Sequence, residues 1–248
     1  MKKTILLFIL LHTFGYADTI GGEVSLGVFN HSPSGQVSYV LPPGNIGTSS
    51  DLEDTLGFSE TQDIFFKAYL EHPLLFLPNI KLGYTKLSHE GSNDVNLFSW
   101  GDIHQFTGNI DNSLALDISD ATLYYEALDN WLEVDLGLTL RYLSGNIAVN
   151  TSAETEVIDF STLFPMLYAK GRFNIPSTDV AVQMEANAIS YGGLTSYDYE
   201  ISARYTLTMG LGLEAGYKSL HLDSDELSDG LDANVDFSGP FVSAIWDF

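Results

Sequence analysis

The sequence contains no cysteine, which excludes disulfide frameworks, thiolate metal sites and cysteine nucleophiles. It is also poor in bases, with 10 Lys and Arg against 33 Asp and Glu and a formal net charge of −23. So little positive charge cannot neutralise a phosphate backbone, so we expect no nucleic-acid partner. Charged residues make up only 17% of the chain, and its 15 Phe, 13 Tyr and 3 Trp argue against a disordered acidic protein.

Long apolar runs are nearly absent, and the one clear run lies near the start, from Ile5 to Leu11. Two lysines precede it, and the small residues Gly15 and Ala17 follow it. This order is typical of a secretory signal peptide, and the apolar run is too short to cross a bilayer as a helix. We therefore expect a signal peptide over residues 1–17, cleavage after Ala17, and a single mature domain over residues 18–248. No later run has the length of a transmembrane helix.

Apolar and polar residues instead alternate with period two. Between Leu132 and Tyr142 every second residue is apolar, and the residues between them include Glu133, Asp135 and Arg141. Eleven alternating residues have the length of a membrane-spanning β-strand. Similar segments recur along the chain, and we count about ten strands, with eight as the alternative.

A soluble sandwich also alternates, so the connections between the segments decide between the two architectures. Segments 31–60, 89–112, 144–160 and 223–233 are long, whereas 72–78, 127–130, 175–177 and 208–210 are short. Long extracellular loops on one rim and short periplasmic turns on the other are typical of outer-membrane barrels. The sequence therefore predicts an all-β fold, a transmembrane antiparallel up-and-down β-barrel in the bacterial outer membrane.

Charged residues within the alternating segments fall on the polar face. In a barrel this face lines the interior, because a Lys or Arg facing lipid at mid-depth costs about 2 to 4 kcal/mol. The bland interpretation, equally valid for a soluble protein, is that charges avoid the buried face. We predict that opposite charges pair across the interior and largely fill it. The predicted interior network consists of Lys67, Glu71, Lys81, Glu133, Asp135, Arg141, Lys170, Arg172, Glu185, Glu200, Arg204, Glu214 and Lys218.

The final strand carries an assembly signal. Phe248 is the last residue, and Trp246, Ala244 and Val242 precede it at alternate positions. This pattern resembles the closing strand that the bacterial barrel-assembly machinery reads. The resemblance implies that machinery and periplasmic chaperones as partners, together with outer-membrane lipid and lipopolysaccharide.

Two blocks carry a wider resemblance. They are the stretch from Glu71 to Tyr84, and the stretch from Asp120 to Asn130 that continues with Asp135 to Leu138. Together they resemble an outer-membrane β-barrel family of proteobacteria whose function is uncharacterised. The resemblance implies shared architecture and supplies no catalytic residue, and the long loops match nothing recognised.

Three classes of function remain open. We favour a narrow or plugged pore, or a structural envelope component, with acidic surface loops. The alternative is a surface binding or adhesion protein that acts through loops 31–60 and 89–112. A hydrolase that uses His31, His89 or His221 at the rim is less favoured, because no catalytic motif accompanies them. We expect no enzymatic activity, no cofactor and no bound metal.

Overall fold

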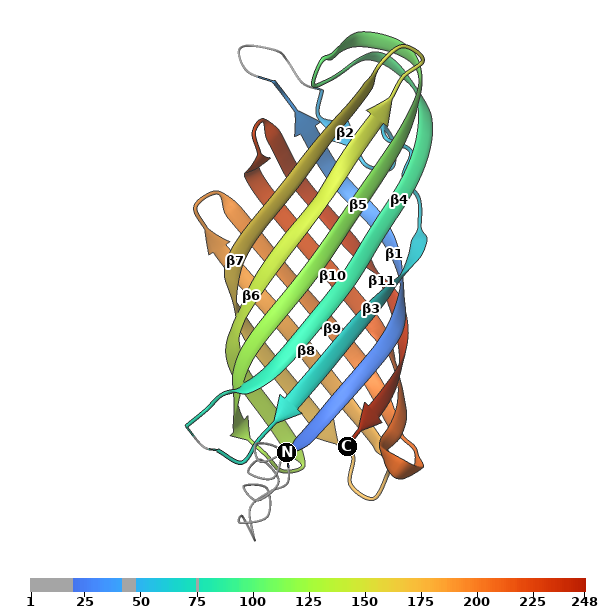
Figure 1. Ribbon diagram of the computed structural model, residues 1–248. Coiled ribbons are helices and arrows are strands. Elements are labelled where there is room, and N and C mark those ends of the chain that lie inside the picture. Colours follow the sequence, from blue (N-terminus) through green and yellow to red (C-terminus); the bar gives the residue numbers. More distant parts are fainter. Residues whose placement is uncertain (1–19, 42–47, 75) are drawn as a thin grey trace, which may run out of the picture.

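The protein folds as a closed β-barrel (Figure 1). The computed structural model describes residues 20–41, 48–74 and 76–248, so the signal peptide predicted over residues 1–17 lies outside the described residues. A two-residue strand, β2 (Ser50–Asp51), pairs with β1. The ten long strands are β1 (Gly21–Tyr39), β3 (Thr61–Glu71), β4 (Asn79–Trp100), β5 (Ile103–Leu128), β6 (Leu132–Asn150), β7 (Thr155–Asn174), β8 (Val180–Tyr191), β9 (Leu194–Thr206), β10 (Leu211–Ser228) and β11 (Leu231–Asp247).

Each long strand pairs antiparallel with its neighbours in the chain, and β11 pairs with β1 to close the ring. The up-and-down barrel is thus confirmed, and the ten long strands make the alternative of eight wrong. The start of β1 and the end of β11 lie at the rim with the short turns, which we call the lower end (Figure 1). The β4–β5 and β6–β7 hairpins extend furthest at the opposite, upper end (Figure 1). In the described part of the chain, no helix is long and apolar enough to cross a membrane.

About halfway along the barrel, the apolar side chains of the strands change from the outer face to the inner face. On β6, Leu136, Leu138 and Leu140 point outward and are about half exposed, whereas Leu143 and Ile147 further along are buried inside. The apolar side chains change faces in the same way on β1, β4, β5, β7, β10 and β11. Outward apolar residues on all ten strands form what we call the apolar band, represented strand by strand by Leu26, Ile64, Leu82, Leu123, Leu138, Leu167, Met184, Ile201, Leu213 and Val242.

This reversal corrects the predicted loops. Segment 89–112 lies almost entirely in β4 and β5, 144–160 in β6 and β7, and 223–233 in β10 and β11. In these segments most of the apolar residues lie on the inner face and no longer on the outer face. A strand that is traced by its outward apolar residues therefore seems to end, although the alternation continues. The pairing of β5 with β4 and β6 is regular around Asp120.

The predicted loop 31–60 is also corrected, since β1 continues to Tyr39 and part of the connection folds inward. Leu52, Leu56 and Phe58 are buried in the core. The side chain of Asn112 donates a hydrogen bond to the carbonyl of Leu56 at 2.8 Å. Gly57 has a φ of +73°, and a Cβ there would lie 2.6 Å from the Ser92 carbonyl oxygen. Residues 50–58 lie between β1, with which β2 pairs, and β4, where Gly91 is bridged to Phe58.

Closure of the ring predicts a role for Phe248. Its backbone N–H donates to the Gly22 carbonyl at 2.9 Å, and it accepts from the Gly22 N–H at 3.0 Å. The Phe248 ring lies over Gly22, where a Cβ would come within 2.6 Å of it. Replacing Phe248 with Lys should lower the yield of folded barrel, because β1 and β11 must pair to remove both edges. Heat-modifiable mobility on a gel measures this yield, with Phe76→Lys in an exposed turn as the control; equal yields would contradict it.

Candidate functional site in the barrel interior

The interior at the level of the apolar band holds the predicted charged residues, and we call this part the charged layer. The thirteen residues lie on the inner side of their strands, and nine of them are almost fully buried. Lys86, which is not among the thirteen, is exposed on the outer side of β4. The strand alternation alone positions them, because each inner residue follows an outward apolar one.

Two ion pairs cross the interior. Lys67 on β3 pairs with Glu200 on β9, and Lys81 on β4 pairs with Glu185 on β8. These strands are not neighbours in the ring, so the four side chains span it. Each pair therefore ties opposite walls of the barrel together.

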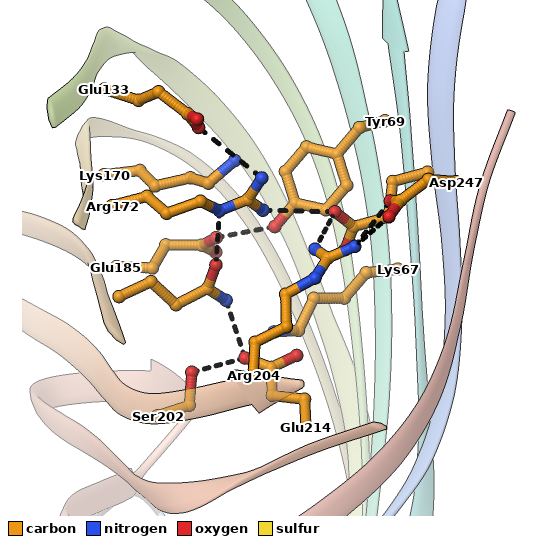
Figure 2. A network of polar contacts seen from close by, with 12 residues as sticks. Lys67, Tyr69, Glu133, Lys170, Arg172, Glu185, Ser202, Arg204, Glu214 and Asp247 are labelled. Atoms are coloured by element: carbon orange, nitrogen blue, oxygen red, sulfur yellow. Dashed lines mark hydrogen bonds and ion pairs between the residues drawn. The ribbon is translucent and has the colours of Figure 1, made fainter. Parts of the chain in front are cut away.

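A third group contains Arg172, Arg204 and Asp247 (Figure 2), and Glu23 joins its two arginines. The Glu23 carboxylate accepts from the guanidinium groups of Arg172, at 3.1 Å, and Arg204. Arg204 also pairs with Asp247 at 2.5 Å, and Arg172 with Glu133 at 3.5 Å. The group joins β1, β6, β7, β9 and β11, so it includes both strands that close the ring.

Arg141 holds the upper part of the charged layer together. Its Nε and Nη2 donate to Asp120 at 2.8 and 2.6 Å, which is the bidentate geometry of a strong pair. Its Nη1 lies 2.7 Å from the Asp198 carboxylate. The arrangement joins β5, β6 and β9. Lower down, Lys170 pairs with Asp135 at 3.5 Å.

Three predicted residues have neutral partners. The Tyr124 hydroxyl donates to Glu71 at 3.0 Å, and Lys218 donates to the Thr85 hydroxyl at 3.0 Å. Glu214 accepts from the amide of Gln183 at 2.6 Å and from Ser202. In the described part of the chain these three charged residues form no ion pair within 4 Å, so the neutral groups are their hydrogen-bond partners.

Sequence reasoning missed four acids and three tyrosines of this layer. Glu23, Asp120, Asp198 and Asp247 complete the ion pairs, and Tyr69, Tyr124 and Tyr168 pack among them. The signal for Glu23 was available, because it alternates with the outward apolar residues Val24 and Leu26, whereas Asp120 follows the polar residue Ser119. The tyrosines gave none, since an isolated Tyr on an alternating strand fits either face.

The interior is filled at both levels. The cavity left among the residues of the charged layer has a volume of about 30 Å³, close to that of one water molecule. Above it, the inner residues are apolar, and we call them the apolar layer: Phe29, Leu87, Leu114, Leu116, Leu143, Ile147, Phe160, Leu220, Leu222 and Phe237. The sequence predicted the filling by charges, and the apolar layer is an addition.

The fold brings two of the three rim histidines together and places the third elsewhere. His31 and His89 are buried in the apolar layer with ring centroids 4.8 Å apart. His31 Nε2 lies 3.3 Å from the Asp63 carboxylate, and His89 Nδ1 lies 2.9 Å from the Ser59 carbonyl. His221 is elsewhere, 2.9 Å from Asp236. The three histidines therefore do not form one group, since His31 and His89 lie together and His221 lies apart with Asp236.

The fold and the interior define a β-barrel of the membrane-spanning class, polar inside and apolar outside over the lower half. No protein-family model and no curated protein matches the chain. The solved structures similar to it include Ail, the attachment invasion locus protein of Yersinia pestis, in complex with the heparin analogue sucrose octasulfate; the TM-score is 0.40 at 11% identity over 92% of this chain and 99% of that one.

Two further similar structures come from Pseudomonas species, and one of them is a transporter by name. A Pseudomonas aeruginosa FadL homologue has a TM-score of 0.35 at 9% identity, covering 93% of this chain and 90% of that one. The P. putida toluene transporter TodX has a TM-score of 0.33 at 9% identity, covering 92% and 89%. These similarities are too low to transfer a ligand or an activity. The proteobacterial family resemblance stays a prediction.

The Glu23 group predicts a large effect of a small substitution. Glu23→Gln removes the charge that faces two buried guanidinium groups, so we expect a loss of about 3 kcal/mol in the free energy of unfolding. Urea titration of the barrel in lipid vesicles measures it. Glu90→Gln, on an exposed outer position, is the control and should change stability little. Equal stability of the two variants would contradict the assignment.

The buried histidines predict acid sensitivity. Burial, reinforced by His89, lowers the pKa of His31 from 6.5 to about 4, and burial also lowers the pKa of His89. Both are neutral in the folded state, so the unfolded state binds more protons as the pH falls from 6.5 to 4, and stability should fall over that window.

Melting temperatures at pH 7.5 and pH 4.5 test this expectation. The double variant His31→Phe/His89→Phe should lose less stability on acidification than the unmodified protein, while His221→Asn should behave like the unmodified protein. An unchanged loss in the double variant would assign the acid sensitivity to carboxylates instead.

Proposed function

We propose that the protein is an integral β-barrel of the bacterial outer membrane with a sealed interior, acting as a structural and surface-exposed component of the envelope. The apolar band supports the membrane location. Leu26, Leu138 and Leu167 expose 58%, 59% and 68% of their surface, which hydrocarbon would cover. Among the described residues, the base on the outer face near the band is Lys86, at its upper edge.

The single observation that carries the sealed interior is its filling by two successive layers. Ion pairs occupy the charged layer, and an ion that passed them would meet the apolar layer, where it would lose its hydration without replacement. The interior of a barrel of this size is readily filled by side chains, whereas open channels are typical of barrels with 16 to 18 strands. The upper half then stands in water as an acidic, closed extension of the barrel.

Surface binding is the second candidate, and the tip of the β4–β5 hairpin favours it. Leu97 is 64% exposed there with a φ of 55°, and Gln105 nearby has a φ of 49°. Such backbone strain in residues other than glycine is found more often at functional sites. Loss of cell-surface adhesion by a Leu97→Asp variant that still folds would favour this function. The buried histidines give no support to a hydrolase.

The membrane location predicts the behaviour of the three tryptophans. Trp131 and Trp246 are exposed by 58% and 52% at the lower end of the band, whereas Trp100 is fully buried in the upper half. In vesicles of brominated phospholipid, fluorescence of Trp131 and Trp246 should be quenched and that of Trp100 should not. Variants that retain one tryptophan each separate the three signals. Equal fluorescence of Trp131 and Trp246 in plain and brominated vesicles would refute the membrane location.

The sealed interior predicts poor conductance. Planar-bilayer recording of the refolded barrel should show no large, stable channel, and any residual leak should favour cations because the loops and rims are acidic. A general porin recorded under the same conditions is the control. Porin-like conductance would overturn the sealed interior, and anion selectivity would overturn the electrostatic argument.

A further inference from the structure

A shallow polar hollow lies on the outer face of the barrel, directly above the apolar band. It has a volume of about 510 Å³ and is lined by Asp117, Ser144, Asn146, Asp159, Ser161 and Ser228. The next outward residues below it are Tyr142 and Leu163, which are exposed and belong to the band. The hollow thus begins where the apolar outer surface ends.

Three neighbouring strands, β5, β6 and β7, build most of the hollow, and Ser228 at the end of β10 completes its lining. Ser144 on β6 is the cross-strand neighbour of Asp117 on β5 and of Ser161 on β7, and Asn146 is the neighbour of Asp159. Adjacent strands lie about 4.8 Å apart, so this row of small polar side chains spans about 10 Å across the sheet. Such a width accommodates a short saccharide lying flat, and the paired strands hold the side chains in place without a ligand.

The residues that line the hollow offer hydrogen-bond acceptors and donors and carry no positive charge. The base beside them is Lys86 on β4, the cross-strand neighbour of Asp117. Asp117 is oriented by the Tyr84 hydroxyl, which donates to its Oδ1 at 2.5 Å and leaves Oδ2 to accept. Within the described residues, no side-chain hydrogen bond engages Ser144, Asn146 or Ser161. Carboxylate, amide and hydroxyl groups match sugar hydroxyls, which both donate and accept. A phosphate group would instead meet two carboxylates.

We propose that this hollow binds the neutral sugars of a glycolipid head group in the outer leaflet. The inference rests on the proposed membrane location, because the apolar band places the hollow at the level of the head groups. Uncharged saccharide is favoured over the phosphate-bearing part of the same lipid by the two carboxylates. The site is specific to one side of the barrel, on β5, β6 and β7.

The test compares two lipopolysaccharide probes on the refolded barrel in mixed micelles. One probe carries the complete core oligosaccharide, and the other is the lipid anchor without these sugars. The unmodified barrel should bind the sugar-bearing probe about tenfold more tightly, as expected for a few additional hydrogen bonds. Free core oligosaccharide should compete for the site.

A matched pair of double variants locates the site. Ser144→Leu/Ser161→Leu fills the hollow on two paired strands and should abolish the preference for sugar. Ser32→Leu/Ser238→Leu makes the same change on another cross-strand pair, on β1 and β11, and should preserve it. Heat-modifiable mobility checks folding. Should the first variant fail to fold, Asn146→Ala/Asp159→Asn replaces it.

The outcomes separate this inference from the proposed function. Equal binding of both probes, or a preference that survives in Ser144→Leu/Ser161→Leu, would overturn the sugar site while leaving the membrane location intact. A preference that vanishes with EDTA would also overturn it, because cations bridging phosphates would then be responsible. Failure of the barrel to float with lipid vesicles would instead contradict the membrane location.

Discussion

The strands that reach both halves of this barrel, β1, β4, β5, β6, β7, β10 and β11, have to satisfy two different surroundings in succession. Over the lower half the outside is apolar, so charged and hydrogen-bonding side chains must point inward. Over the upper half the outside is polar, so apolar side chains point inward and form an ordinary core. The strands meet both requirements with unbroken backbone pairing, because a shift of one residue in the apolar pattern exchanges the two faces. The charged layer and the apolar layer both follow from this exchange.

The charged layer is therefore a consequence of the apolar band. Once the outward positions are apolar, the bases and acids of the lower half share a confined interior, where an unpaired charge is costly. Pairs such as Lys67 with Glu200 and Lys81 with Glu185 satisfy these charges by crossing the barrel. Arg141 is satisfied by acids from two walls. A cavity of about 30 Å³ remains among Lys67, Lys81 and Arg141, enough for a water molecule.

The sequence predicted the barrel, its ten long strands and the inner face of the lower half, because alternation there is strict. It did not reveal the length of the strands. Ile110, Leu114 and Leu116 on β5 belong to the same strand as Leu123, but they lie on the opposite face. The cross-barrel pairs were also beyond prediction, since alternation fixes which face a residue occupies and not its height. The burial of His31 beside His89 depends on the register of β1, β3 and β4.

The Glu23 group gives the closing seam a means of rejecting wrong registers. Glu23 and Asp247 are cross-strand neighbours on the first and last strands, and Arg204 bridges them from a third strand. A slip of one residue during closure would turn Glu23 toward lipid and leave two arginines without it. A slip of two would keep the face but change the height of the carboxylate relative to Arg172 and Arg204. The register of the final pairing step therefore depends on ion pairs between residues far apart in the chain. A ring closed in the wrong register loses these pairs and is less stable.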